Sequence, residues 1–222
     1  MATLRAVLFD LDGVLVDSHS LHYQSWQRLA DELGLMFNES LGDTFRGMAR
    51  DECVRVLFRD FNRLPVPADD TIEELMDRKN SYYRGILDVA APGDLVLPGA
   101  VELLDALRRE EVLIVIASGS KNAKAVIRQA RLEEYPDAVI DRFDVVDTKP
   151  DPAIFRVALT RVSVAPDDAV GVEDAPLGIT ALHGAGVKAV GVGHYVTDAD
   201  LLVPSVADLT VAHMRALVTG TA

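Results

Sequence analysis

The sequence predicts an α/β fold in which a mainly parallel sheet is covered by helices on both faces. Two observations lead to this prediction. Short β-branched apolar segments recur along the chain, and amphipathic helical patterns separate most of them. A third observation adds a second domain: one long helical stretch interrupts the alternation directly after the first apolar segment. The chain has 222 residues, 49% of them hydrophobic, and can bury a sizeable core.

The predicted strands are short, and helical patterns fill the intervals between most of them. Apolar residues recur at helical spacing over residues 101–107, 125–130, 154–162 and 179–183. This alternation is typical of a Rossmann-like core, in which ligands bind beyond the carboxyl ends of the strands. The five predicted strands are residues 6–10, 113–118, 138–140, 169–172 and 187–192.

Residues 18–89 contain no convincing strand and form an insertion. Three apolar stripes at helical spacing lie in it, around Leu29, Leu57 and Leu75. We therefore expect a small α-helical cap domain, residues 18–89, inserted into a catalytic core made of residues 1–17 and 90–222. Two connections tether the cap, and the second, at residues 91–94, is rich in turn-forming residues. Such a pair of tethers could act as a hinge.

Composition limits the classes of partner. The chain has 22 Lys plus Arg against 35 Asp plus Glu, and its net charge of −13 argues against nucleic-acid and anionic membrane surfaces. Its single cysteine, Cys53, cannot form an intrachain disulfide. No apolar run approaches the roughly 20 residues that span a bilayer, and no leader is recognisable. We expect a cytoplasmic protein without nucleic-acid or membrane partners.

Acidic residues follow the first predicted strand. Asp10 and Asp12 stand one residue apart directly after a buried apolar run. Two carboxylates at the end of a buried strand cost folding free energy unless something uses them. A cation would satisfy them, and one of them could attack a phosphorus atom. An isolated aspartate pair before glycine is also ordinary turn chemistry, so the remaining strand ends decide between these interpretations.

Other polar residues lie at the other strand ends. Each has an ordinary interpretation on its own: a serine can cap a helix, a lysine can be solvated, and acidic residues favour helix N-termini. On the same edge of one sheet, however, they predict a cation site beside an anion site. Oxygen ligands with a phosphate nearby favour Mg²⁺. These residues are Ser118, Ser120, Lys121 and Asn122, then Lys149 with Pro150, and then Glu173 with Asp174.

The complete series of motifs resembles a known family. The motifs are D-x-D-G-V at 10–14, S-x-S-K-N at 118–122, K-P-D-P at 149–152 and E-D at 173–174. They resemble the four motifs of the haloacid dehalogenase-like phosphotransferase superfamily, and the match covers the whole chain. The cap is similar to that of the β-phosphoglucomutase family, notably in R-G-M-A-R at 46–50 and R-K-N at 78–80.

The resemblance implies roles for the core residues. Asp10 would be the nucleophile that becomes an aspartyl phosphate, and Asp12 would be the general acid and base. Ser118 and Lys149 would bind the transferring phosphoryl group. The implied Mg²⁺ ligands are Asp10, the backbone carbonyl of Asp12, and Asp174, with Glu173 close by.

The resemblance also implies roles in the cap. Arg50 would grip a second phosphate with its forked donors, assisted by Arg46. His22 and Lys79 would engage Asp12 when the cap closes. A solvated arginine and a plain core or surface histidine are the alternatives for Arg50 and His22, and a core tryptophan is the alternative for Trp26. The other implied substrate contacts are Trp26, Gly47, Met48, Ser120, Lys121 and Asn122, and the implied hinge residues are Asp17 and Ser18.

Three functional hypotheses follow. The first is a mutase that interconverts β-D-glucose 1-phosphate and glucose 6-phosphate through a β-glucose 1,6-bisphosphate. The second is a Mg²⁺-dependent phosphatase of a small sugar or polyol phosphate, in which water attacks the aspartyl phosphate. The third is a non-catalytic metabolite-binding protein, which would be expected to lose the nucleophile or an acidic ligand. The presence of Asp10, Asp12, Lys149 and Asp174 places it last. A phosphorylated sugar is the expected partner, and a monomer the expected state.

Overall fold

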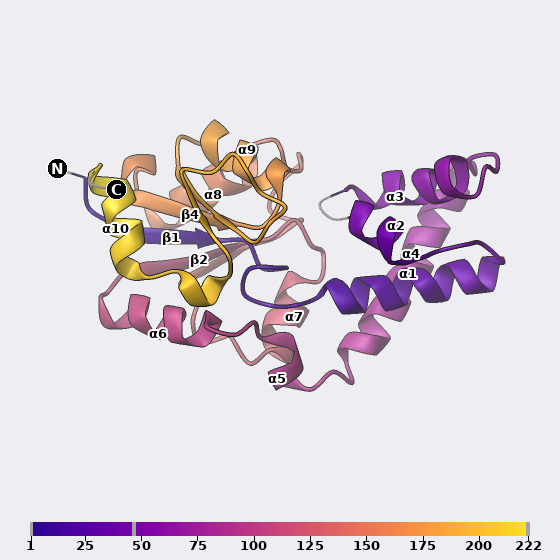
Figure 1. Ribbon diagram of the computed structural model, residues 1–222, viewed down its shortest axis with the longest axis horizontal. Coiled ribbons are helices and arrows are strands. Elements are labelled where there is room, and N and C mark those ends of the chain that lie inside the picture. Colours follow the sequence, from indigo (N-terminus) through magenta and orange to yellow (C-terminus); the bar gives the residue numbers. More distant parts are fainter. Residues whose placement is uncertain (1, 46–47, 221–222) are drawn as a thin grey trace. The chain divides into compact units, whose positions relative to one another are not determined.

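The computed structural model describes residues 2–45 and 48–220, and its contacts divide the chain into two compact units (Figure 1). The core unit comprises Met1–Asp17 and Ala91–Ala222, and the cap unit comprises Ser18–Ala90. This division falls one residue beyond the boundary expected from the sequence. Among the described residues, no helix is both long and apolar enough to cross a membrane.

The core unit is built on a six-stranded sheet with the order β3-β2-β1-β4-β5-β6. Every neighbouring pair of strands is parallel. This architecture confirms the predicted α/β, Rossmann-like core. The strands are β1 Ala6–Phe9, β2 Leu113–Ala117, β3 Ala138–Ile140, β4 Ala169–Glu173, β5 Lys188–Val192 and β6 Leu201–Val203.

The sixth strand was not expected from the sequence. It has three residues, pairs only with β5, and leaves Leu202 48% exposed. So short an apolar run carries too little periodicity to be told from a loop. The predicted turn-rich stretch at 91–94 is also corrected. It forms a short helix, α5 (Pro92–Leu95), whose proline at the first position suits a helix start.

Helices cover both faces of the sheet (Figure 1). On one face α6 packs against β2 and α10 packs against β4 and β5. On the other face α8 packs against β2 and β3 while α9 packs against β4 and β5. Because both faces are covered, the central strand β1 is buried along its whole length, as its continuous apolar sequence predicts. These helices are α6 Ala100–Arg109, α8 Ala153–Val162, α9 Pro176–Gly184 and α10 Val211–Thr219, and the core unit also contains α7 Ala123–Gln129.

The cap unit is helical, and its described residues (18–45 and 48–90) contain no strand. A buried cluster that includes Trp26, Leu29, Val54, Leu57 and Ile72 holds its helices together. The long helices α1 and α4 pack against each other, which buries the stripes that the sequence pattern predicts. The elements are α1 His19–Leu33, α2 Glu39–Thr44, α3 Arg50–Val56, a π-helical turn η1 Leu57–Phe61, and α4 Asp69–Leu87.

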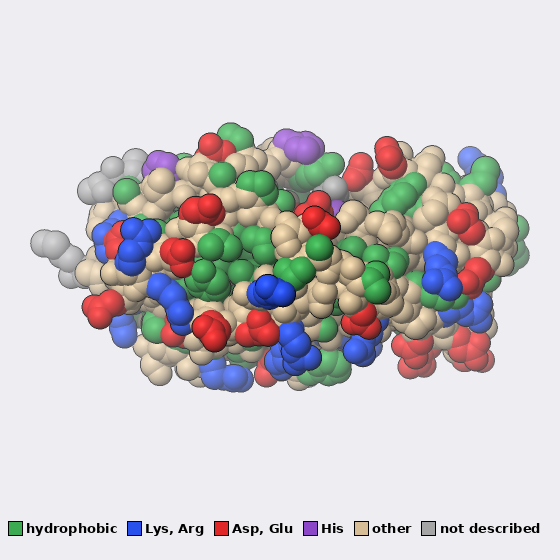
Figure 2. Space-filling view, turned by 90° about the horizontal axis from the view of Figure 1, so that it is seen from below, with side chains coloured by type: hydrophobic (Ala, Val, Ile, Leu, Met, Phe, Trp, Pro, Cys, Tyr) green, Lys and Arg blue, Asp and Glu red, His purple; other side chains and the backbone are tan. Residues whose placement is uncertain are grey.

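Charges of both signs are mixed on the surface of the core. Figure 2 shows basic and acidic side chains interspersed over the part of the core that it presents. One ion pair of the core, Arg215 Nη1 to Glu110 Oε2 at 2.5 Å, joins α10 to the end of α6. Exposed pairs of this kind contribute little free energy, about 0–1 kcal/mol each. The core therefore depends mainly on apolar burial.

Asp200 connects the segment before β6 to β5 and α9. Its carboxylate accepts hydrogen bonds from Lys188 Nζ (2.8 Å), the Ala189 amide (2.8 Å) and His183 Nε2 (3.0 Å). These donors belong to β5 and α9, so Asp200 anchors the segment that leads into β6. Burial raises the pKa of Asp200, but the hydrogen bonds outweigh it and lower the pKa to about 2.

We expect Asp200→Asn to lower the free energy of unfolding by about 1 kcal/mol near neutral pH, because charge-assisted hydrogen bonds are lost. The folded-state pKa of about 2 lies below the ordinary value of an aspartate, so the carboxylate contributes its full stabilisation above that ordinary value. Its contribution is lost as the pH falls through about 2, and the two proteins should converge there. Urea unfolding across this pH range measures the effect. Asp198→Asn, at an exposed position of the same loop, is the control and should change stability by less than about 0.5 kcal/mol.

Candidate active site

The candidate active site lies at the carboxyl ends of three neighbouring strands. The strand order places β1 between β2 and β4 at the centre of the sheet. Asp10 follows β1, Ser118 follows β2, and Glu173 ends β4. Backbone hydrogen bonds extend the ladder past the strand ends, from the Asp10 amide to the Val172 carbonyl (2.9 Å) and from the Ser118 amide to the Ile140 carbonyl (3.0 Å). The parallel topology therefore gathers residues that are far apart in the sequence.

A tight turn follows Asp10 and sets the direction of Asp12. The Gly13 amide donates to the Val16 carbonyl (2.7 Å), and the amides of Leu15 and Val16 donate to the Leu11 carbonyl. Gly13 has a φ of 86°, which lies in the left-handed region that favours glycine. The glycine of the D-x-D-G motif thus allows the chain to fold back directly after the two aspartates.

Lys149 links two carboxylates at the centre of the site. Its Nζ lies 2.5 Å from Asp10 Oδ1 and also donates to Glu173 Oε1. The other oxygen of Glu173 accepts from the amides of Asp174 (2.9 Å) and Ala175 (3.0 Å). Asp10 and Glu173 are 8% and 1% exposed. Lys149 also lies 5.0 Å from the ring centroid of Phe155. All of these groups are therefore held in place and largely removed from water.

Several carboxylates lie close to Asp10. Burial raises the pKa of Asp10 well above its usual range; Lys149 opposes this shift, while the nearby charges of Glu173, Asp12 and Asp174 add to it. Burial also lowers the pKa of Lys149, but Asp10 and Glu173 outweigh it and keep the ammonium charged. Three other carboxylates thus act on the Asp10 carboxyl. A cation bound beside them would favour an ionised Asp10.

The donor set suits a hard divalent cation. Over residues 2–45 and 48–220, no three His, Cys, Asp or Glu side chains are grouped to hold a metal ion by themselves. Mg²⁺ does not need such a group, because it usually takes one or two carboxylates and completes its shell with waters and substrate phosphate oxygens. Asp10 and Asp174 with a backbone carbonyl therefore fit Mg²⁺ better than they fit a metal that needs an all-protein cage.

The loop after β2 presents hydroxyl groups to the same edge. Ser118 is buried, and its Oγ accepts from the Ser120 amide (3.1 Å). The Oγ of Ser120 accepts in turn from the Asn122 amide (3.1 Å). These bonds shape the turn that leads into α7, where Asn122 is the N-cap residue. The Ser118 hydroxyl keeps its own proton to donate. Lys121 is exposed and Asn122 is buried.

The cap unit contains a cluster of basic side chains. Lys79 Nζ lies 2.7 Å from His22 Nδ1. Lys79 is 2% exposed and lies 5.2 Å from the Trp26 ring and 5.1 Å from the Tyr83 ring. An ammonium can only donate, so Nδ1 accepts and the neutral imidazole carries its proton on Nε2. His22 is thereby prepared as a hydrogen-bond donor on its other side.

Arg50 belongs to this cluster. Its Nη1 donates to Asn80 Oδ1 (3.1 Å), which joins the start of α3 to α4. Burial and the nearby charges of Lys79, Arg50 and His19 together lower the pKa of His22 well below its usual value. His22 therefore favours its neutral form beside the side chains of Lys79 and Arg50. Basic side chains of this kind suit an anionic group such as a phosphate.

The structure places the remaining predicted residues as follows. Trp26 is buried in the cap cluster, where it packs edge-on against Phe45 at 5.2 Å between ring centroids. Met48 is partly buried against the same cluster. The Asp17 amide donates to the Leu95 carbonyl (2.7 Å), and Ser18 is buried at the N-cap of α1. Arg46 and Gly47 lie outside the described residues.

Three further residues support the site, although the sequence alone gave them no role. Phe155 lies under Lys149, Asn80 holds Arg50, and Gly178 borders the Glu173 carboxylate. Asn80 follows Lys79 in the R-K-N motif, which was its only signal. Phe155 and Gly178 look like ordinary helix residues in the sequence, because their partners lie on other elements.

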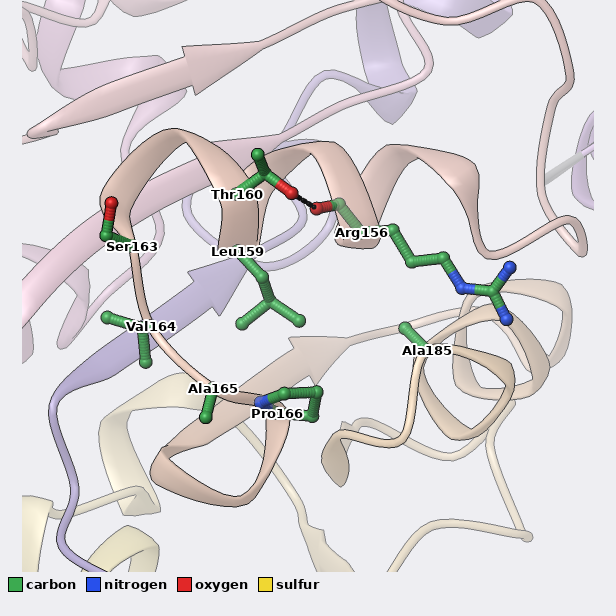
Figure 3. A pocket seen from close by; sticks show the side chains of 8 residues that line it. All are labelled: Arg156, Leu159, Thr160, Ser163, Val164, Ala165, Pro166 and Ala185. Carbon is green, nitrogen blue, oxygen red and sulfur yellow. Dashed lines mark hydrogen bonds between the residues drawn. The ribbon is translucent and has the colours of Figure 1, made fainter.

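One surface hollow lies elsewhere on the core (Figure 3). It runs along α8 to the segment that enters β4. Within α8, Thr160 Oγ1 donates to the Arg156 carbonyl at 2.8 Å. That segment leads to the amino end of β4, so the hollow lies away from Asp10 and Lys149. Its lining includes Arg156, Leu159, Thr160, Ser163, Pro166 and Ala185.

Relatives with two kinds of activity are similar to the chain. It is 34% identical to a β-phosphoglucomutase of Bacillus subtilis over 209 residues, which cover 93% of this chain and 92% of that protein. It is 27% identical to a phosphorylated carbohydrates phosphatase of Thermotoga maritima over 202 residues, 90% of each chain. The crystal structure of a β-phosphoglucomutase from Clostridium difficile superposes with a TM-score of 0.89 at 28% identity and 99% coverage of both chains.

The matched family agrees with the site geometry. A model of the family described as haloacid dehalogenase-like hydrolase matches residues 4–186, a span that holds Asp10, Ser118, Lys149 and Glu173. The parallel sheet, the four strand-end motifs and this match together establish that the chain belongs to the haloacid dehalogenase-like hydrolase family.

Proposed function

We propose that the protein is a phosphoryl-transfer mutase that interconverts β-D-glucose 1-phosphate and glucose 6-phosphate. The reaction would pass through an aspartyl phosphate and a β-glucose 1,6-bisphosphate. The observation that carries this proposal is the basic cluster of the cap, in which Lys79, Arg50 and neutral His22 gather on facing helices. A mutase must hold a second phosphate while the first one reacts. The similarity to two β-phosphoglucomutases supports the same choice.

The core residues would carry out the phosphoryl transfer. One carboxylate oxygen of Asp10 forms a bond to phosphorus as the bond from phosphorus to the leaving oxygen breaks. Lys149 holds Asp10 Oδ1, so the other oxygen is oriented to attack. Asp12 gives its proton to the leaving oxygen and later takes one from the attacking sugar hydroxyl. Lys149 and Ser118 donate to the phosphoryl oxygens, where charge must be stabilised during transfer.

We assign a Mg²⁺ ion to Asp10, the Asp12 carbonyl and Asp174. When bound, it would neutralise the phosphoryl oxygens and the surplus charge of the carboxylates. Glu173 receives a different role, because its Oε1 accepts from Lys149 and its Oε2 from two amides. Glu173 would position Lys149 rather than act as a direct ligand.

The cap residues would determine whether the mutase or the phosphatase reaction takes place. The guanidinium of Arg50 suits a phosphate because its donors lie in a planar fork, and Asn80 holds one edge of that fork. His22 would offer its Nε2 proton to Asp12 or to a sugar oxygen, with Lys79 fixing the tautomer. Asp12 would then act as general acid and base only when a substrate is bound whose phosphate contacts Arg50 and whose sugar oxygen contacts His22.

A phosphatase of a small phosphorylated sugar is the second candidate. The Thermotoga maritima relative with that type of name supports it. The core chemistry would be the same up to the aspartyl phosphate, which water would then attack in place of a sugar hydroxyl. The two candidates therefore differ in what the cap does, not in the nucleophile.

A coupled assay distinguishes the two candidates. The protein is supplied with β-glucose 1-phosphate, Mg²⁺ and a trace of the 1,6-bisphosphate, and glucose 6-phosphate and free phosphate are measured together. We expect glucose 6-phosphate to account for nearly all substrate consumed. Free phosphate rising in step with substrate loss would support the phosphatase. Asp10→Asn is the matched control and should abolish both products, since an amide is a poor nucleophile.

Arg50→Ala tests the role of the cap. Loss of a charged, forked contact to the second phosphate should lower kcat/KM of the mutase reaction by about 100-fold. Hydrolysis of p-nitrophenyl phosphate has no second phosphate and should change by less than about threefold. Arg59→Ala, at an exposed cap arginine that pairs with Glu52 and Asp60, is the control and should affect neither reaction. Equal losses in both reactions would deny Arg50 this role.

A further inference from the structure

Gly178 lies against the carboxylate of Glu173. It is a buried residue of the first turn of α9. A Cβ atom built there would lie 1.9 Å from Glu173 Oε1, 2.0 Å from its Cδ and 2.5 Å from its Oε2. Real Cβ atoms do not approach other heavy atoms this closely. Any side chain at position 178 would therefore displace the Glu173 carboxylate.

Backbone conformation does not require a glycine here. Gly178 is absent from the glycines with positive φ, and its amide makes an ordinary helical-turn bond to the Ala175 carbonyl (3.0 Å). Glycine inside a helix costs about 1 kcal/mol relative to alanine. Gly178 is therefore explained not by its backbone conformation but by the space that its missing side chain leaves. The Glu173 carboxylate fills that space.

The carboxylate in that space has no freedom to move elsewhere. It accepts from two backbone amides through Oε2 and from Lys149 through Oε1. Lys149 in turn contacts Asp10 Oδ1 at 2.5 Å. A shift of the carboxylate would break at least one of these bonds and would loosen the ammonium next to the nucleophile.

We propose that Gly178 is a positioning residue, which acts through Glu173 to hold Lys149 against Asp10. The proposal rests on the function proposed above, because Lys149 matters only if Asp10 receives a phosphoryl group. It assigns a role to a position of α9 that carries no polar side chain. It also predicts that the effect of a side chain at 178 depends on the residue at 173.

A double-mutant cycle tests this dependence. The four proteins are the unchanged chain, Gly178→Ala, Glu173→Ala and the double variant, with kcat for p-nitrophenyl phosphate and the thermal midpoint as readouts. With Glu173 present, Gly178→Ala should lower kcat by about tenfold or more and lower the midpoint. With Ala at 173, the same change should alter kcat by less than about twofold and raise the midpoint, because alanine favours the helix.

The change in thermal midpoint caused by Gly178→Ala should reverse its sign between the two backgrounds. This reversal distinguishes a clash with Glu173 from a general effect of alanine on helix stability. Equal changes in both backgrounds, or an unchanged kcat in Gly178→Ala, would overturn the proposal. If Glu173→Ala does not fold, Glu173→Asp provides the second background, since its shorter carboxylate withdraws from position 178. There the loss caused by Gly178→Ala should be partly rescued, and an undiminished loss would count against the proposal.

Two controls complete the experiment. Gly85→Ala makes the same change in α4, where a Cβ would meet nothing within 4 Å, and it should leave kcat unchanged. Release of p-nitrophenol requires formation of the aspartyl phosphate, the step that both candidates share, so the choice between them does not affect the comparison of variants. If the unchanged chain neither forms glucose 6-phosphate nor releases p-nitrophenol, the proposed function fails. The midpoints alone then still decide whether Gly178 and Glu173 are coupled.

Discussion

The contact of Lys149 with two buried carboxylates is the constraint on which the rest of the site depends. Asp10 and Glu173 end adjacent strands and are almost fully buried, so without a cation between them their charges would repel in a region of low dielectric. Breaking such a buried group by removing one partner typically costs about 3–5 kcal/mol. The lysine therefore holds the carboxylates at the ends of β1 and β4 together at the candidate active site. Glu173 is itself held in position for this contact. Its carboxylate accepts from the two following amides and occupies the space beside Gly178.

The sheet edge could be predicted from the sequence because its signals are local. Each strand is a short apolar run, and each polar motif follows directly in the chain, so parallel topology alone brings Asp10, Ser118 and Glu173 together. The five predicted strands agree with the structure to within one residue at each end. The features missed from the sequence depend on partners that are distant in sequence or on very short elements. Gly178 is recognised only from the position of Glu173, Phe155 only from Lys149, and β6 only from its pairing with β5.

The cap shows a second arrangement of buried charge. Lys79 is buried against the rings of Trp26 and Tyr83, and its ammonium donates to His22. Sequence periodicity placed these side chains on helices, but the tautomer of His22 follows only from the contact itself. Carboxylates surround Asp10 in the core, while basic side chains lie beside His22 in the cap. The proposed mutase reaction would use the first group, with a cation, for the reacting phosphate and the second group for the other phosphate.

The chain is similar both to a β-phosphoglucomutase and to a phosphorylated carbohydrates phosphatase, so overall identity does not distinguish the two reactions. The contact of Asp10, Lys149 and Glu173 would serve an aspartyl phosphate whether a sugar hydroxyl or water attacks it. The distinction must therefore lie in groups that act after the aspartyl phosphate has formed. Within the described cap residues, Arg50 with Asn80 and His22 with Lys79 are donors that fit a second phosphate and a sugar oxygen. If those donors exclude water, the cap determines whether a sugar hydroxyl or water accepts the phosphoryl group. The bonds to phosphorus would nevertheless form and break in the core.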